Sequence, residues 1–299
     1  MAAGDSVNDL LEGVFDLHVH SAPDLVPRCV DDLEMARRVR NAGMAGFVIK
    51  SHHTPTADRA TLCNTAIPGI RVVGSITLNH YVGGLNPSAV EGAAQSGARF
   101  VWLPTTDAAN EAQILAGWPE DRELPPYLQV KKDLLDRGRL PPPIAVSDDG
   151  GRLTSDAMAI LEVVRDYELT LCTGHLGWPE IRALVPAGVR AGVQKIVITH
   201  PESPSISLSP DQESWLAGQG AYFERCFAYC ASPEIVDDVV SSVRLTGVSR
   251  NVLSSDLGRE AGPMPDVGLA QFIGELWQRG FTRAELEQMT VLTPSSLVG

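Results

Sequence analysis

The histidines of this sequence fall at the ends of short apolar runs. His18 and His20 end the first run, and His175, His200 and Asp256 each follow a later one. Imidazole and carboxylate groups are common protein ligands of divalent transition metals. The pattern therefore predicts one metal site that is assembled from residues far apart in the sequence.

The spacing of the first two histidines fits a strand. Residues two apart on a strand face the same side, so we expect His18 and His20 to share a face with Asp16, which could orient a ligand. The alternate residues should face surrounding helices; these are Phe15, Leu17 and Val19. The alternative is that both histidines only fill the core, but two unpaired imidazoles would be costly to bury, so we favour the metal.

Other polar residues are candidates for substrate contacts. His80 and Tyr81 follow the third apolar run, and Arg28 and Arg259 lie in expected loops. Arginine can hold a substrate carboxylate with two hydrogen bonds, although surface arginine is the commoner explanation. His52 follows the second run at strand spacing from Lys50, so we expect it to face the same pocket, whereas His53 should turn away.

These candidates need strands to position them, and eight strand-like runs are present. Most are short, rich in β-branched residues and bounded by glycine, proline or polar clusters, as is typical of buried parallel strands. We expect strands at Val14–His20, Gly46–Lys50, Arg71–Leu78, Arg99–Pro104, Leu169–Thr173, Lys195–Thr199, Ala221–Phe227 and Asn251–Ser255. We expect helices between them at Val30–Ala42, Pro87–Gln95, Ser155–Asp166, Glu180–Ala191, Pro233–Leu245 and Val267–Arg279.

Eight alternations of strand and helix predict a single α/β domain over residues 1–299, a (β/α)8 TIM barrel. An open doubly wound sheet is the alternative, but the first strand is not followed by a glycine-rich phosphate motif. About sixty residues separate the fourth and fifth strands, far more than the usual loop of ~2–6 residues plus a helix. We interpret residues 106–154 as a lid-like insertion or an oligomer contact, with a tight turn at Asp149 and Gly150; a surface excursion without function is the alternative.

Composition limits the partners. The formal net charge of −13 argues against nucleic acid and anionic membranes, and no apolar run approaches the ~20 residues of a membrane span. Five cysteines without CxxC spacing indicate no disulfide framework. With no signal peptide at the N-terminus, we expect a cytoplasmic protein that acts on a small molecule.

The ordered set of His18-Val19-His20, then His175, His200 and Asp256, resembles the amidohydrolase superfamily of metal-dependent barrels. The C-terminal segment 289–299 is similar to the helix that closes many members. The resemblance implies that one ion is held by His18, His20 and Asp256 and a second by His175 and His200. Asp256 would also take a proton from metal-bound water; the alternative for Asp256 is a helix N-cap.

The sequence departs from this family at the bridging ligand. Many binuclear members carry a carboxylated lysine at the end of the fourth strand, where this chain has Pro104 and Thr105. Lys50 is the only lysine among the candidate ligands, and a buried lysine shifts its pKa readily. We therefore expect Lys50 to be a ligand; the alternative is an inward lysine paired with Asp16 or Glu224.

The resulting expectation is a metal-dependent hydrolase with one or two divalent ions, most simply Zn2+, although Fe, Ni or Mn suits the same donors. A metal-bound hydroxide would attack the carbonyl of an amide, lactam or ester, with Asp256 as the proton shuttle. A phosphoesterase or decarboxylase on the same barrel and a non-catalytic ligand-binding barrel remain alternatives. By analogy with intracellular barrels, we expect a homo-oligomer.

Overall fold

The computed structural model describes residues 10–119, 121, 123–124, 126–230 and 232–299. It contains eight parallel strands that are hydrogen-bonded in sequence order. The strands are β1 Phe15–Val19, β2 Gly46–Ile49, β3 Arg71–Thr77, β4 Ala98–Trp102, β5 Thr170–Cys172, β6 Ile196–Thr199, β7 Tyr222–Cys226 and β8 Asn251–Ser254. Each lies within two residues of its expected bounds, because short β-branched runs between turn residues have few other ways to be buried.

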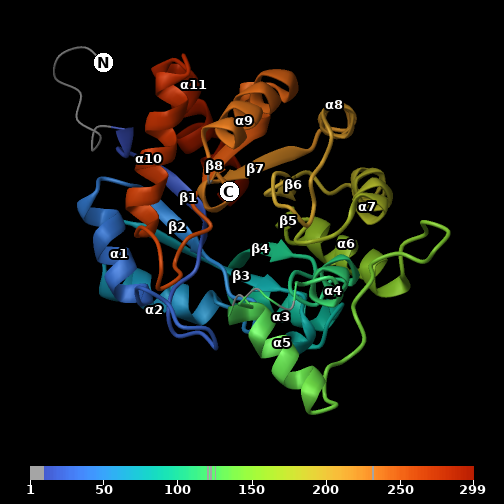
Figure 1. Ribbon diagram of the computed structural model, residues 1–299. Coiled ribbons are helices and arrows are strands. Elements are labelled where there is room, and N and C mark those ends of the chain that lie inside the picture. The colour runs from blue at the N-terminus through green and yellow to red at the C-terminus, as the bar shows by residue number, and fades with distance from the viewer. Residues whose placement is uncertain (1–9, 120, 122, 125, 231) are drawn as a thin grey trace.

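The sheet closes on itself where the last strand meets the first. The backbone NH of Asp256 donates to the carbonyl of His18 at 2.9 Å, and the NH of His20 donates to the carbonyl of Leu257 at 2.9 Å. Figure 1 shows the helices arranged around this ring of strands. The expected (β/α)8 barrel is therefore confirmed.

Twelve helices are present in the described part of the chain. They are α1 Asp32–Asn41, α2 Ala57–Ala66, α3 Pro87–Gln95, α4 Ala109–Ala116, α5 Pro126–Asp136, α6 Ser155–Asp166, α7 Trp178–Ala191, α8 Pro210–Gly218, α9 Pro233–Thr246, α10 Pro265–Gln278, α11 Arg283–Glu287 and α12 Thr293–Val298. The expected helices at α3 and α6 match to the residue, helped by Asn86 and Thr154, which cap the first turns.

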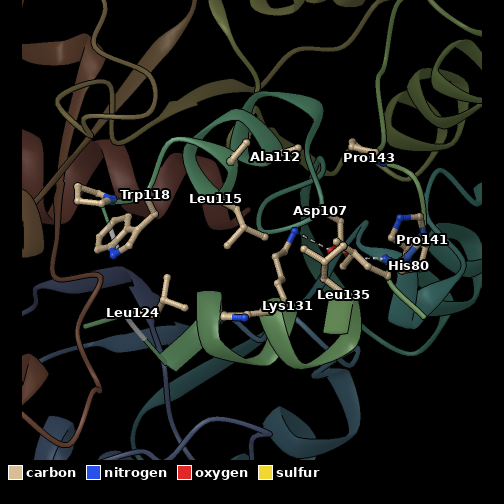
Figure 2. Close-up of a pocket in the computed structure, with 14 residues that line it drawn as sticks. His80, Asp107, Ala112, Leu115, Trp118, Leu124, Lys131, Leu135, Pro141 and Pro143 are labelled. Carbon is tan, nitrogen blue, oxygen red and sulfur yellow. Dashed lines mark hydrogen bonds and ion pairs between the residues drawn. The ribbon is translucent and has the colours of Figure 1, made fainter. Parts of the chain in front are cut away.

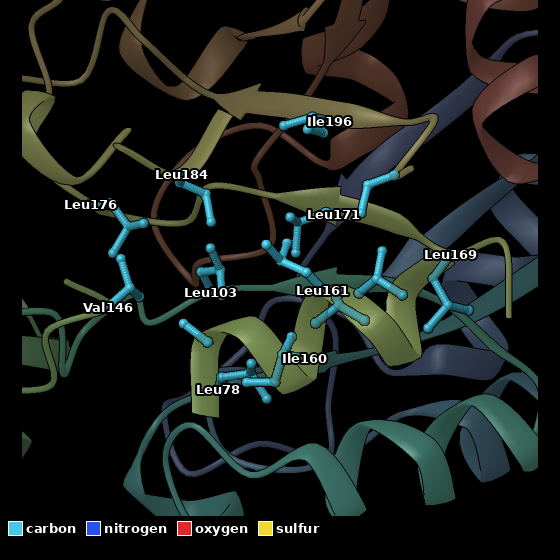
Figure 3. Close-up of a cluster of buried hydrophobic side chains, with 14 of the residues drawn as sticks. Leu78, Leu103, Val146, Ile160, Leu161, Leu169, Leu171, Leu176, Leu184 and Ile196 are labelled. Atoms are coloured by element: carbon cyan, nitrogen blue, oxygen red, sulfur yellow. The ribbon is translucent and has the colours of Figure 1, made fainter. Parts of the chain in front are cut away.

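The core has an outer layer between strands and helices and an inner layer inside the barrel. Figure 3 shows part of the outer layer, where Ile160 and Leu161 of α6 pack toward Leu171 and Ile196 of the sheet. The inner cluster includes Val48, Trp102, Val197 and Leu297 of α12. The C-terminal helix therefore packs against the inner residues, as the family resemblance implied.

One expectation about β1 is wrong. The pairing with β2 shifts register between Asp16 and Val19, so β1 carries one extra residue there. As a result, Phe15 and Leu17 pack in the inner cluster rather than against helices, while Val19 packs in the outer layer as expected. Strict alternation fails because a bulge lets both Leu17 and His18 turn toward the barrel axis.

The same bulge changes the role of Asp16. Its Oδ1 accepts hydrogen bonds from the backbone NH groups of His18, at 3.1 Å, and Ser255, at 3.0 Å. Asp16 therefore holds the backbone of β1 against the segment after β8, and it does not bond the imidazole of His18 or His20. It supports the site through the main chain.

The long connection between β4 and β5 contains α4 and α5. A short antiparallel bridge joins Ser147 to Leu153, with the expected tight turn between them closed by the NH of Gly151 donating to the carbonyl of Asp148. Within the described residues, no helix combines the length and the apolar character that a membrane span requires.

Candidate metal centre

Three side chains from the two ends of the chain converge at the carboxyl ends of β1 and β8. Oδ1 of Asp256 lies 3.0 Å from Nε2 of His18 and 3.0 Å from Nε2 of His20. All three residues are buried. The carboxyl ends of barrel strands are where such folds carry their chemistry, and two imidazoles with a carboxylate are a typical donor set for a divalent ion.

The backbone around Asp256 is shaped to bring these groups together. Asp256 has a φ of 49°, in the left-handed region that non-glycine residues rarely adopt. Gly258, with a φ of 129°, lies so close to β1 that a Cβ there would sit 1.7 Å from the carbonyl oxygen of His20. The chain after β8 can therefore press against His20 only because residue 258 is glycine.

The other face of His18 is held by β7. Nδ1 of His18 lies 3.2 Å from Oε2 of Glu224 and 3.9 Å from Sγ of Cys226. A carboxylate on one ring nitrogen fixes the tautomer and leaves the other nitrogen free to bind a metal. Glu224, named above as an alternative partner of Lys50, is thus the partner of His18.

His175 and His200 lie beside this group but meet different partners. Their ring centroids are 4.9 Å apart, and the ring of His200 lies 6.0 Å from that of His18. Nδ1 of His175 lies 2.8 Å from Oε1 of Glu111 on α4. Neither ring nitrogen of His200 has a hydrogen-bond partner among the described residues, although the residue is fully buried.

Lys50 is buried among these groups. Its Nζ lies 5.4 Å from the ring centroid of Trp102, and it lines the same cavity as His20 and Asp256. Burial lowers the pKa of Lys50, and the charges of Asp256 and Glu224 offset only part of that effect. Within the described residues no ion pair joins Lys50 to Asp16 or Glu224, which was the alternative to a ligand role.

Electrostatics keep the carboxylate of Asp256 charged. Burial alone would raise its pKa, but His18 and His20 outweigh burial and hold that pKa well below its ordinary value. The group therefore offers a full negative charge at the point where the two imidazoles meet.

His20, Lys50 and Asp256 line a cavity of about 510 Å³, a size typical of small-molecule sites. Imidazoles of His20, His52 and His175 contribute to its wall with Tyr229. Apolar residues dominate the rest of the upper wall; these include Val26, Pro27, Ile114, Pro204 and Ala261.

A family model with the description "family of unknown function" (DUF6282) matches residues 13–224. The chain belongs to this family. No protein of curated function matches the sequence. The family assignment therefore carries no activity with it, and the fold has to be compared with solved structures.

Several solved structures share the fold over nearly their whole length. The probable dipeptidase PvdM from Pseudomonas aeruginosa is 14% identical, with a TM-score of 0.65 over 98% of this chain and 96% of that chain. An amidohydrolase from Pseudomonas aeruginosa is 10% identical, with a TM-score of 0.64 over 98% of both chains. The organophosphorus hydrolase from Deinococcus radiodurans is 15% identical, with a TM-score of 0.57 over 99% of this chain and 94% of that chain.

At these identities the likeness shows a common fold. One of the three structures is described as an amidohydrolase, the name of the superfamily that the sequence resembles. They are described as hydrolases or peptidases, and these activities are stated of those proteins alone.

The donor atoms of this family member fit a divalent ion. Among the described residues, His18, His20 and Asp256 bring three ligand atoms within 4.8 Å of one another, and a second such set joins His18 to Glu224 and Cys226. Buried imidazole nitrogens without partners, as in His200, are costly unless a cation accounts for them. The first set, which faces the cavity, is the better metal site because the second uses the far nitrogen of His18.

Two of the expected substrate contacts lie in the cavity and two do not. His52 and Arg28 line it; Nδ1 of His52 lies 2.8 Å from Oγ1 of Thr105, and Arg28 is paired with Asp24. His80 instead lines a neighbouring cavity (Figure 2), and its Nε2 lies 2.8 Å from the carbonyl oxygen of Pro142.

Tyr81 also does not line the cavity of Asp256; it lies with His80 on a short 3-10 helix, His80–Val82, that follows β3. Its ring lies 4.8 Å from the ring of His53, which turns from the pocket as expected and bonds Asp24 at 2.7 Å. His80 and Tyr81 therefore do not line the cavity at Asp256, and their contact with a substrate stays a prediction.

Glu111 and Tyr229 are two of the cavity residues that sequence reasoning missed. Glu111 lies on a helix of the insertion, which has no strand end to mark its direction. Tyr229 follows β7 in a short 3-10 helix, and its ring lies 4.8 Å from the ring of His200. The only available signal was that each lies shortly after a strand of the barrel.

Proposed function

We propose that this chain is a metal-dependent hydrolase that cleaves an amide, lactam or ester bond of a small molecule. The convergence of His18, His20 and Asp256, of which His20 and Asp256 line the cavity, carries the proposal. When bound there, a divalent ion such as Zn2+ would activate water and polarise the substrate carbonyl.

The chain's own residues would orient the metal ligands, transfer the proton and exclude bulk water. Glu224 fixes the ring of His18 through Nδ1, so that Nε2 faces the ion. Asp256 is ionised and can accept a proton at its carboxylate, then return it to the leaving group. The apolar upper wall, with Ile114 and Tyr229, would exclude bulk water from the reacting bond.

The finer assignments extend this proposal. His175, His200 and Lys50 are the candidates for holding a second ion, and His52 and Arg28 for contacting the substrate. The insertion of residues 106–154 supplies part of the cavity wall through Ile114 and Glu111, which supports a lid-like role. We also propose zinc as the ion, a cytoplasmic location and a homo-oligomer.

The test pairs metal content with a substrate panel. Protein purified without chelator is analysed for zinc, iron, nickel and manganese, then assayed on dipeptides, lactones, aryl esters, phosphoesters and aromatic carboxylates. We expect bound metal and carbonyl-bond hydrolysis that Asp256→Asn reduces by about 10²–10⁴-fold, the usual contribution of a proton-transfer residue. Asp107→Asn, in the neighbouring cavity, is the matched control and should retain activity.

Two results would contradict the proposal. If the protein holds no metal even after zinc is added, the histidines only fill the core of the barrel and the proposal is wrong. Phosphate release or loss of CO2 without carbonyl hydrolysis would move the assignment to a phosphoesterase or a decarboxylase.

A further inference from the structure

Glu111 is a buried carboxylate that the insertion places beside a histidine of the cavity. It lies on α4, its side chain is 3% exposed, and its Oε1 lies 2.8 Å from Nδ1 of His175. Both residues line the cavity that contains Asp256. Since α4 belongs to the long connection between β4 and β5, the regular strand pattern of a barrel does not provide this carboxylate.

A carboxylate at one imidazole nitrogen determines which nitrogen carries the proton. An ionised carboxylate can only accept hydrogen bonds, so Glu111 favours the tautomer of His175 with the proton on Nδ1. Nε2 of His175 then keeps the lone pair with which an imidazole binds a cation. The carboxylate also restricts the orientation of the ring, as is typical of the partners of metal-binding histidines.

A similar pair lies at the end of β1. Nδ1 of His18 lies 3.2 Å from Oε2 of Glu224, and Nε2 of the same ring lies 3.0 Å from Oδ1 of Asp256. Glu224 belongs to β7, whereas Glu111 belongs to α4, so different elements supply the two carboxylates. His18 and His175 therefore both meet a carboxylate through Nδ1.

Glu111 and His175 are close, although they are not aligned for a straight hydrogen bond. Nδ1 of His175 is buried and makes no hydrogen bond of good geometry within the described residues, while Oε1 of Glu111 lies 2.8 Å away. Hydrogen bonds of active-site groups are often poorly aligned before a ligand binds, and they tighten in the complex. In the same part of the chain, Glu111 forms the only ion pair of His175.

The start of α4 is fixed against the barrel, so Glu111 is held in place. Nδ2 of Asn110 donates to the carbonyl of His175 at 3.2 Å and to the carbonyl of Ser205 at 2.6 Å. The residue before Glu111 therefore joins α4 to the loops that follow β5 and β6. Other residues of the same helix line the neighbouring cavity (Figure 2).

We propose that Glu111 is a positioning residue through which the insertion orients His175 as a cation ligand. The inference rests on the proposed metal-dependent function. Glu111 acts through the ring of His175 and does not bind the ion itself. The insertion thus contributes to the metal centre as well as to the cavity wall.

Zinc affinity in a double-mutant cycle tests this role without an activity assay. Wild type, Glu111→Ala, His175→Ala and the double variant are stripped of metal and titrated with Zn2+ against a competing chelator, with circular dichroism as the check of folding. Loss of a residue that orients a metal-binding histidine costs about 10–100-fold in metal affinity. We expect this loss from Glu111→Ala in the wild-type background and no further loss when His175 is already alanine, because both residues act through one ring.

Two further variants separate positioning from structural support. Glu111→Gln keeps an oxygen that can accept a hydrogen bond from Nδ1 of His175, so it should retain most of the zinc affinity that Glu111→Ala loses. Equal losses in the glutamine and alanine variants would contradict a hydrogen bond to the ring. Glu180→Ala is the matched control: Glu180 accepts a hydrogen bond from the NH of Val146, does not line the cavity, and should bind zinc as wild type does.

The tautomer of His175 is a second readout, which a purely structural role would not change. Long-range 1H–15N spectra of the metal-free protein, assigned with His175→Ala, report which nitrogen carries the proton. We expect the proton on Nδ1 in wild type and in Glu111→Gln, and a shift toward Nε2 in Glu111→Ala. The same tautomer in all three proteins would overturn the positioning role.

The outcomes also distinguish this inference from the proposed function. Equal losses of affinity from Glu111→Ala in both backgrounds would show that Glu111 acts independently of His175. No loss in the wild-type background would show that Glu111 does not support the metal centre. Either result overturns the inference alone, whereas a folded wild type that binds no zinc would overturn the proposed function as well.

Discussion

Single residues at the site combine burial with charge, and Lys50 is the clearest case. It is 1% exposed, and burial lowers its pKa toward the range in which the neutral amine is accessible. An amine of this kind can take up CO2 and become a carboxylate ligand, a role that many members of the resembled family give to a lysine at the end of the fourth strand.

We predict that Lys50→Ala lowers bound zinc from two ions per chain to one or none. The measurement is metal content after dialysis against buffered zinc. Lys132→Ala, which removes an exposed lysine of α5, should leave the metal content unchanged. An unchanged stoichiometry in Lys50→Ala would show that the lysine is a buried cation and not a ligand.

The cysteines give a prediction that depends on pH. All five are free, and burial is the largest cause that raises the pKa of each thiol, to about 12 for Cys63 and Cys230. Since only the thiolate reacts, we predict slow labelling of the native protein at pH 8 and faster labelling as pH rises. A colorimetric thiol reagent should count five thiols in urea, and rapid native labelling of Cys63, Cys172 or Cys226 at pH 8 would contradict their burial.

At the level of elements, the strands and many helices could be predicted because their signals are local. The bulge in β1 could not, because it is set by pairing with β2, and alternation assumes a regular strand. Helix α2 (residues 57–66) also escaped prediction, since its sequence ADRATLCNTA has little apolar periodicity.

The residues of the candidate site also divide into those that the sequence predicts and those that it does not. His18, His20 and Asp256 follow strands, so the convergence of strand ends predicts them. Glu111, on a helix of the insertion, and His80, on a 3-10 helix after β3, depend on loop geometry that strand periodicity does not encode.

The close approach of the turn after β8 to β1 can be tested by a glycine-to-alanine substitution, which adds one methyl group. Gly258→Ala would place Cβ 1.7 Å from the carbonyl oxygen of His20, and we predict a loss of several kcal/mol of unfolding free energy with weaker zinc binding. Gly262→Ala is the matched control, because its φ of 125° carries similar strain but nothing lies within 4 Å of the added Cβ. Urea denaturation that gave equal effects for both variants would rule out the clash.

At the level of the whole molecule, a metal that binds only the folded chain should stabilise it. Zinc at about 100 times its dissociation constant adds roughly 2.7 kcal/mol, which corresponds to a Tm rise of several degrees for a domain of this size. We predict that a chelator lowers the Tm by this amount and that zinc restores it. His80→Ala should show the same shift, since His80 lies outside the site, while a Tm unaffected by chelation would contradict a site formed on folding.

Because the barrel closes through its first and last strands, the candidate site is completed only late in synthesis of the chain. His20 and Asp256 are separated by 236 positions in the chain. A nascent polypeptide that has left the ribosome only as far as β7 carries the imidazoles but not the carboxylate that completes the trio. The three groups can therefore meet only after β8 has been synthesised, so a chain that ends before Asp256 would lack the proposed metal site.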